Sequence, residues 1–209
     1  EISRSDWSSD VCSSDLTIDL RRKTIRVMEA VVLGSTGIKV NKNGFGALPI
    51  QRVSTEDAVK LARKAYEAGI TFFDTARFYT DSEEKLGEAF DGMREKIYIA
   101  TKTAAKNADE FWEQLGISLH NLRTDYIDIY QFHNPSFCPK PGDGTGLYEA
   151  MLEAKAQGKI RHIGITNHRL AVAEEAIESG LYETLQFPFC YLASDRDIAL
   201  VEKCKKANM

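Results

Sequence analysis

The sequence contains no apolar run that approaches the ~20 residues needed for a membrane-spanning helix. It also lacks a basic stripe, because its Lys and Arg residues are interspersed with Asp and Glu and the formal net charge is −4. Such a charge pattern favours neither nucleic acid nor an anionic membrane as a partner. The remaining composition, with 43% hydrophobic and 28% charged residues, is typical of a folded globular protein.

Cysteine is scarce, and its spacing is uninformative for metal binding. The four cysteines form no CxxC pair and have no histidine nearby at ligand spacing: Cys12, Cys138, Cys190 and Cys204. This pattern indicates buried or free thiols of a reducing compartment, with no structural metal ion and a cytoplasmic location. Cys190 and Cys204 lie within apolar patterns, which predicts that both belong to the core.

Residues 5–16 have no helical or strand periodicity and no signal-peptide layout. They resemble the translation of a common sequencing-adapter oligonucleotide, and the alternative is a genuine disordered leader. We therefore expect residues 1–27 to be a non-native or disordered leader and Met28 to be a native start. Residues 28–40 predict a small hairpin that turns at residues 35–37 and caps the bottom of a barrel.

From residue 44 onward, short apolar strands alternate with amphipathic helices. Strands are predicted near residues 44–48, 70–74, 97–102, 126–133, 162–167 and 184–187, and each is followed by a helix. Strands that alternate with helices lie parallel in one sheet. A closed barrel of this type has eight such units. The sequence therefore predicts a (β/α)8 TIM barrel, truncated here to about six βα units, over residues 28–209.

An open six-stranded sheet is the alternative architecture. A doubly wound nucleotide-binding fold usually carries a glycine-rich phosphate fingerprint after its first strand. No such fingerprint follows residues 44–48, which favours the barrel.

Polar residues lie where the predicted strands end. Asp74, Lys102, His133 and Asn167 close four of them, Gln186 lies inside the last, and Tyr79 follows Asp74 in a loop. Because the carboxyl ends of parallel strands gather on one face of a barrel, we expect these side chains to form one site.

Four of these residues suit proton transfer to a carbonyl oxygen. A free tyrosine has a pKa of about 10, and a neighbouring ammonium such as Lys102 favours the phenolate. A carboxylate such as Asp74 keeps that ammonium charged, and His133 is placed to bind the substrate oxygen. No side chain supplies a hydride, so a nicotinamide must do so. The amides of Asn167 and Gln186 suit its carboxamide.

Four segments, in order and at similar spacings, resemble motifs of the aldo-keto reductase family. They are residues 69–76 with Tyr79, Ser82-Glu83 and Leu86-Gly87; residues 100–102; residues 132–135; and residues 164–168, with Thr166 in place of a serine. The resemblance extends over essentially all of residues 28–209.

This resemblance implies a barrel that binds NADPH across its C-terminal face. The choice between NADPH and NADH stays open, and the implied substrate is a small-molecule carbonyl compound. By position, Tyr79 is the general acid, Lys102 lowers its pKa, Asp74 anchors the lysine and His133 orients the carbonyl. The residues implied to lie along the cofactor are Gly46, Ala47, Asp74, Thr166, Asn167 and Gln186, and Leu48 and Phe78 are implied in the pocket wall. The closest motif variants belong to a bacterial branch whose members often add a C-terminal iron–sulfur region, which would lie in a segment missing from this chain.

Two other functions are compatible with these residues. Some members of the family keep the nicotinamide site but serve as regulatory subunits with little turnover. Alternatively, Lys102 at a strand end is compatible with a plain ion pair or with the lysine of a Schiff-base enzyme, such as a class I aldolase-like barrel.

Overall fold

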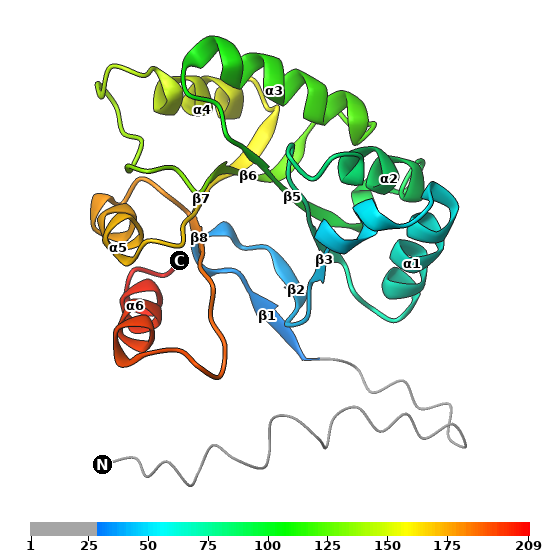
Figure 1. Cartoon of the computed structure of the whole chain (residues 1–209), viewed down its shortest axis with the longest axis horizontal. Helices are drawn as coiled ribbons and strands as arrows, with labels where there is room; N and C mark the ends of the chain where they lie inside the picture. Colours follow the sequence, from blue (N-terminus) through cyan, green and yellow to red (C-terminus); the bar gives the residue numbers. More distant parts are fainter. Residues whose placement is uncertain (1–28) are drawn as a thin grey trace, which may run out of the picture.

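The computed structural model describes residues 29–209, so the predicted leader and Met28 lie outside the described residues. Figure 1 shows the elements in chain order. The strands are β1 (Ala30–Val32), β2 (Lys39–Asn41), β3 (Phe45–Gly46), β4 (Phe72–Asp74), β5 (Tyr98–Thr103), β6 (Ile127–His133), β7 (Ile160–Thr166) and β8 (Thr184–Gln186). The helices are α1 (Thr55–Glu67), α2 (Ser82–Ala89), α3 (Ala108–Asn121), α4 (Leu147–Ala156), α5 (Leu170–Ser179) and α6 (Asp195–Lys206). Short 3-10 turns span Gly34–Thr36, Leu48–Arg52 and Arg94–Lys96.

Strands β3 to β8 form one parallel sheet whose spatial order is the chain order, β3-β4-β5-β6-β7-β8. A doubly wound sheet reverses its strand order at a switch point, and no reversal occurs in this sheet. The helices lie along the outside of the curved sheet (Figure 1). The described residues therefore form six strands of a (β/α)8 barrel, as predicted, and the doubly wound alternative is wrong.

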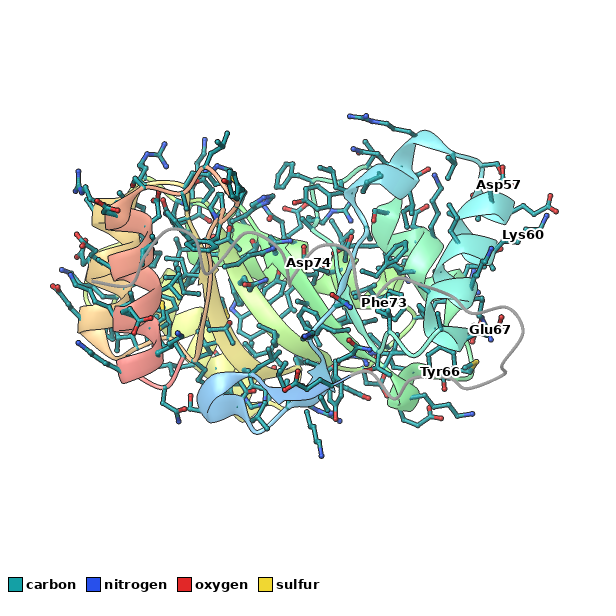
Figure 2. The ribbon with its side chains drawn as sticks, turned by 90° about the horizontal axis from the view of Figure 1, so that it is seen from below. Asp57, Lys60, Tyr66, Glu67, Phe73 and Asp74 are labelled. Atoms are coloured by element: carbon teal, nitrogen blue, oxygen red, sulfur yellow. The ribbon has the colours of Figure 1, made fainter. Side chains whose placement is uncertain are left out.

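Side chains alternate between the two faces of each strand, and this alternation separates core from site. Phe73, Ile99 and Tyr130 point toward the helices and are fully buried there. Asp74, which follows Phe73, and Lys102, which lies three residues after Ile99, point to the barrel interior. In Figure 2, Phe73 and Asp74 lie in the middle of the molecule, and α1 lies at its outer edge.

The hairpin of β1 and β2 is antiparallel and closes the interior from below, as predicted. Its buried residues Ile38 and Val40 pack against Ala100 and Ile129 of the sheet, beside Tyr98 at the start of β5. The apolar lower interior is thereby covered, and the polar residues remain at the upper, carboxyl end of the strands.

Helix α2 lies unusually close to the end of α3, and Gly87 explains this approach. A Cβ atom at this position would lie 2.1 Å from the carbonyl oxygen of Asn121, which no side chain tolerates. Glycine thus lets the backbone of α2 approach the backbone at the end of α3.

The three cysteines within residues 29–209 are free thiols. Cys138 is buried, and Cys204 packs partly buried against a cluster formed by α5 and α6. Cys190 is exposed, so its predicted core position is wrong. It lies in the loop between β8 and α6, beside the exposed side chains of Phe189 and Tyr191, where an apolar sequence is not buried.

No helix in the described part of the chain has both the length and the apolar character that crossing a membrane requires.

Candidate active site

Asp74 and Lys102 form a close ion pair inside the barrel. Asp74 is the last residue of β4, and Lys102 is the last but one of β5. The Nζ atom of Lys102 lies 2.7 Å from Oδ2 of Asp74 and donates a second hydrogen bond, of 2.6 Å, to the carbonyl oxygen of Thr75. Lys102 is only 2% exposed. A buried ammonium is stable only with such partners, and Asp74 and the Thr75 carbonyl supply them here.

Tyr79 lies next to this pair, in the loop between β4 and α2. The Nζ atom of Lys102 is 5.1 Å from the centroid of the Tyr79 ring. The ring of His133 meets the Tyr79 ring edge-on, with 5.7 Å between centroids and an angle of 82° between the planes. The structure thus brings all four predicted proton-transfer residues together from β4, β5, β6 and one loop.

The pKa of Tyr79 departs from the sequence-based expectation. Burial raises the pKa of the Tyr79 phenol above its usual value, and the negative charge of Asp74 raises it further. The predicted net lowering of the Tyr79 pKa by Lys102 is therefore wrong for this structure. The ammonium is paired with Asp74 at 2.7 Å, so the carboxylate offsets part of the stabilisation that the ammonium gives to the phenolate. As a result the phenol stays protonated at neutral pH, which is the form that a proton donor needs.

The other two groups are also shifted by burial. Burial lowers the pKa of Lys102, and the opposing charges of Asp74 and Glu83 partly offset this effect. Burial lowers the pKa of His133 to about 4, and the charge of Lys102 adds to this shift. His133 is therefore a neutral imidazole at pH 7, able to donate a hydrogen bond without carrying charge.

We expect His133 in the folded chain to titrate near pH 4, instead of near its ordinary value of 6.5. The unfolded chain takes up this proton between pH 6.5 and 4, while the folded chain does not, so the group lowers stability progressively as the pH falls through that window. NMR titration of the imidazole, assigned with the His133→Gln variant, measures the midpoint. A midpoint near the ordinary value would contradict the burial argument.

The predicted cofactor residues lie along the same end of the sheet, with different exposure. Gly46 is exposed, and nothing lies within 4 Å of the position that a Cβ would take. Ala47 is buried, and its backbone N–H donates to the carbonyl oxygen of Asp74 at 2.8 Å. Gln186 is exposed at the end of β8, and its Nε2 atom is 3.4 Å from Oδ2 of Asp74 across the interior.

Thr166 and Asn167 are buried instead, and their polar atoms hold the loop after β6. Oγ1 of Thr166 accepts the backbone N–H of Asn134 at 3.1 Å. The Asn167 amide donates to the carbonyl oxygen of Pro135 and accepts the backbone N–H of Arg169, both at 2.8 Å. Each side chain therefore has a structural partner, and binding of a nicotinamide by these two residues stays a prediction.

These features fit an extended nicotinamide cofactor. The open backbone at Gly46 permits close approach of a ligand, and the exposed amide of Gln186 supplies both a donor and an acceptor.

A cavity of about 310 Å³ opens below Asp74 in the barrel interior. It is lined by Phe72, Ala100, Gln131 and Gln186, among others. Gln131 was missed by sequence reasoning, although it lies two residues before His133 in β6 and therefore on the same face. Its Nε2 atom lies 3.5 Å from Oε1 of Gln186, so it orients that amide.

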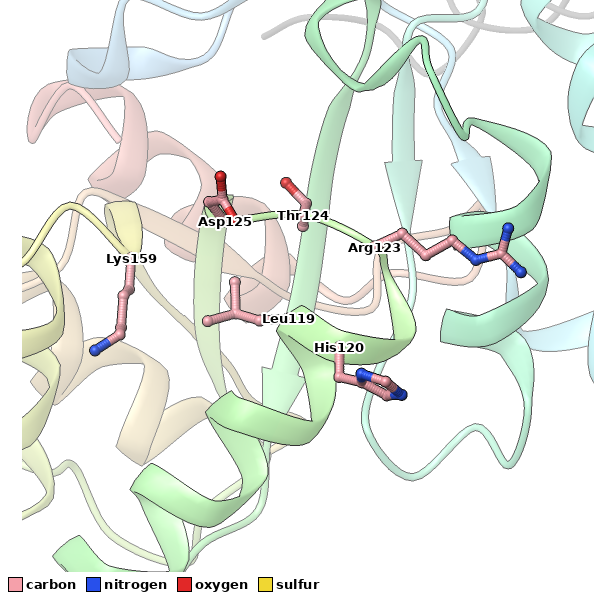
Figure 3. Close-up of a pocket in the computed structure, with 6 residues that line it drawn as sticks. All are labelled: Leu119, His120, Arg123, Thr124, Asp125 and Lys159. Atoms are coloured by element: carbon pink, nitrogen blue, oxygen red, sulfur yellow. The ribbon is translucent and has the colours of Figure 1, made fainter.

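A second, wider hollow of about 580 Å³ lies between the end of α3 and the starts of β6 and β7 (Figure 3). Its lining residues are Leu119, His120, Arg123, Thr124, Asp125 and Lys159. The side chains of Arg123 and Lys159 point away from one another (Figure 3), and none of the predicted site residues lines it. This hollow lies at the amino-terminal end of the strands, opposite the proton-transfer residues.

A family model described as the aldo/keto reductase family matches residues 39–209. The chain belongs to this family. Membership of the aldo/keto reductases agrees with the barrel order of the strands and with the residues at their ends.

Curated relatives are about one-third identical to the chain over the parts that align. It is 34% identical to L-galactose dehydrogenase of Arabidopsis thaliana over 154 residues, which cover 66% of this chain and 48% of the relative. It is 32% identical to aldo-keto reductase YhdN of Bacillus subtilis over 181 residues, which cover 78% of this chain and 54% of that relative. The chain therefore spans about half the length of these curated relatives.

Solved structures of the family share the fold. The holo form of aldo-keto reductase AKR11C1 from Bacillus halodurans matches with a TM-score of 0.77 and 25% identity, over 87% of this chain and 64% of that one. The thermostable aldo-keto reductase Tm1743, in complex with the inhibitor epalrestat, matches with a TM-score of 0.74 and 30% identity. The match covers 87% of this chain and 70% of that one.

Proposed function

We propose that the full protein reduces an aldehyde or ketone to an alcohol with NADPH or NADH, and that Tyr79 is its general acid. The convergence of the Tyr79 ring with the Lys102–Asp74 ion pair and the His133 ring is the observation that carries this proposal. Relatives named as reductases and dehydrogenases support the reaction class. A neighbouring structure, an aldo-keto reductase from Bombyx mori, is described as a complex with NADP, which supports the cofactor class.

In this mechanism the carbonyl oxygen of the substrate lies between His133 and Tyr79. Neutral His133 donates a hydrogen bond that orients the carbonyl, and the Tyr79 hydroxyl gives its proton to the oxygen. Lys102 stabilises the phenolate that Tyr79 becomes, and Asp74 keeps the lysine charged and in place. The hydride for the carbonyl carbon would come from a nicotinamide when one is bound. One hydride and one proton together convert the carbonyl to an alcohol.

The residues proposed to hold the cofactor lie along the rim. Gln186, Asn167 and Thr166 would hold the nicotinamide, and Gly46, Ala47 and Asp74 would hold its ribose. The exposed positions of Gly46 and Gln186 support this assignment most directly.

The geometry argues against the Schiff-base alternative. A nucleophilic lysine needs a free amine, and burial does lower the pKa of Lys102 in that direction. However, Nζ donates to Asp74 at 2.7 Å and to the Thr75 carbonyl at 2.6 Å, and both contacts favour the ammonium. Within residues 29–209, no specific contact favours the regulatory-subunit alternative.

Steady-state assay of the full-length protein tests the proposal. We expect carbonyl-dependent oxidation of reduced cofactor with at least one member of a panel of aldehydes and ketones. Tight cofactor binding without turnover on any member would favour the regulatory subunit. A covalent adduct trapped on Lys102 by borohydride would favour the Schiff-base enzyme.

We further propose that the protein works in the cytoplasm on a small-molecule substrate. The free thiols among the described cysteines support a reducing compartment. Among residues 29–209 no group of three His, Cys, Asp or Glu side chains is placed to hold a metal ion, and an iron–sulfur cluster is not part of this proposal.

A further inference from the structure

Behind the sheet lies a buried carboxylate that the mechanism above does not use. Glu83, the second residue of α2, is fully buried on the helix side of β5. A carboxylate without water is stable only when its oxygens are paired. One oxygen, Oε1, accepts a hydrogen bond of 2.7 Å from the hydroxyl of Thr101, and the other forms an ion pair with Arg77.

The two partners of Glu83 lie next to the two central groups of the active site. Thr101 directly precedes Lys102 in β5, and its side chain therefore points to the opposite face of the sheet. Arg77 lies two residues before Tyr79, and its backbone N–H donates to the carbonyl oxygen of Lys102 at 3.0 Å. Glu83 thus joins the loop of the general acid to the strand of the lysine, from behind.

Other hydrogen bonds also hold this loop, among them those from the Tyr79 backbone N–H to the Ala76 carbonyl oxygen at 3.0 Å and from the Thr80 hydroxyl to Oε1 of Gln51 at 3.2 Å. Its ends are tied by the hydroxyl of Ser82, which contacts Thr75 Oγ1 and donates to the carbonyl oxygen of Ala47, both at 2.9 Å. Between these ends, Thr80 has a φ of 42°, in the left-handed region that a β-branched residue adopts only under external constraint. The Arg77–Glu83 pair supplies a side-chain tie within this segment.

We propose that Glu83 is a positioning residue, which sets the distance between the Tyr79 phenol and the Lys102 ammonium through Arg77 and Thr101. The proposal rests on the proposed function, because it assigns Tyr79 and Lys102 their roles in proton transfer. A general acid displaced by about 1 Å can lose about 100-fold in rate. Glu83 therefore acts on the chemical step without touching substrate or cofactor.

A purely structural role for Glu83 predicts a different pattern. Loss of packing alone would lower the folded fraction, so turnover and cofactor binding would fall together. A positioning role lowers kcat in folded protein and leaves the dissociation constant for NADPH almost unchanged, because the rim residues are held by other contacts.

Glu83→Gln in the full-length protein is the first test. Glutamine keeps the shape of the side chain and an acceptor for Thr101, but it removes the ion pair with Arg77. We expect kcat to fall about 10- to 100-fold, with the Kd for NADPH within about twofold of wild type. Glu88→Gln is the matched control, since Glu88 lies on the same helix, is 49% exposed in its side chain and meets Arg123 only at 3.7 Å. This control should turn over like wild type.

A pair of variants at Thr101 provides a second test that does not alter Glu83. Thr101→Val removes the hydroxyl that donates to the carboxylate, and Thr101→Ser retains it. We expect the valine variant to lose kcat about tenfold relative to the serine variant, at equal NADPH affinity. Equal kcat in the two variants, or wild-type kcat in folded Glu83→Gln, overturns the proposal.

Hydrogen exchange at the Arg77 amide separates this proposal from the proposed function. The Arg77 amide donates a hydrogen bond to the Lys102 carbonyl oxygen. If Glu83 holds the loop, this amide exchanges faster in Glu83→Gln than in Glu88→Gln. This comparison needs no turnover. If wild-type protein reduces no carbonyl, the proposed function fails, and the exchange rates still decide whether Glu83 holds the loop. Unchanged exchange at the Arg77 amide overturns the proposal that Glu83 holds this loop.

Discussion

Replacing Tyr79 with phenylalanine should abolish carbonyl reduction and leave NADPH binding nearly intact. The change removes one oxygen, while the ring keeps its contacts with Lys102 and His133. General acid catalysis contributes about 10²- to 10⁴-fold, so we expect kcat to fall by at least that range. Steady-state kinetics and fluorescence titration of NADPH on the full-length variant measure the two effects separately.

Tyr98→Phe is the matched control for this experiment. Tyr98 lies at the start of β5, at the opposite end of the sheet, where it packs beside the hairpin. Loss of its hydroxyl should leave turnover unchanged. Equal loss of turnover and NADPH affinity in Tyr79→Phe would remove Tyr79 from the acid role, and so would turnover near that of wild type.

Replacing Lys102 with methionine should cripple turnover and also lower the free energy of unfolding. Without the ammonium, the Tyr79 phenolate loses its neighbouring positive charge. Burial and the charge of Asp74 already raise the pKa of the Tyr79 phenol. Asp74 also loses its partner at 2.7 Å and becomes an unpaired charge at the mouth of the barrel. Breaking such a pair costs about 3 kcal/mol. Kinetics at neutral pH and urea denaturation measure the two losses.

A double variant separates the two effects of the lysine. Asp74→Asn combined with Lys102→Met removes the unpaired carboxylate, so we expect it to recover part of the lost stability without recovering turnover. Recovery of turnover in the double variant would show that Lys102 only neutralises Asp74. Near wild-type turnover in Lys102→Met alone would refute its role beside Tyr79.

The positions of the strands and helices follow closely from local sequence patterns. Each of the predicted helices and strands from residue 44 onward is present, with ends shifted by a few residues at most. The caps explain this success, because Ser54 and Asn107 accept the backbone N–H groups of Asp57 and Glu110 as such residues do at helix starts. Local propensity and periodicity depend on neighbouring residues, which the sequence contains in full.

The convergence of the residues proposed for proton transfer was also predictable from their spacing. Side chains alternate between the two faces of a strand, and this alternation turns Asp74 and Lys102 inward. Both residues lie near strand ends. The parallel order of the strands then brings them to one face. Their contact distance, in contrast, depends on the strand register, in which Asp74 pairs with Ala100, two residues before Lys102.

The properties that depend on burial were decided only by the tertiary structure. The sequence shows which side chains carry charge, but a pKa depends on how much water and which charges surround the group, and these come from segments far apart in the chain. The tertiary structure therefore reversed the expected shift at Tyr79 and gave the Asn167 amide backbone partners at Pro135 and Arg169. It also placed Glu83 beside Thr101 and Arg77, because these contacts join segments that are not adjacent in the sequence.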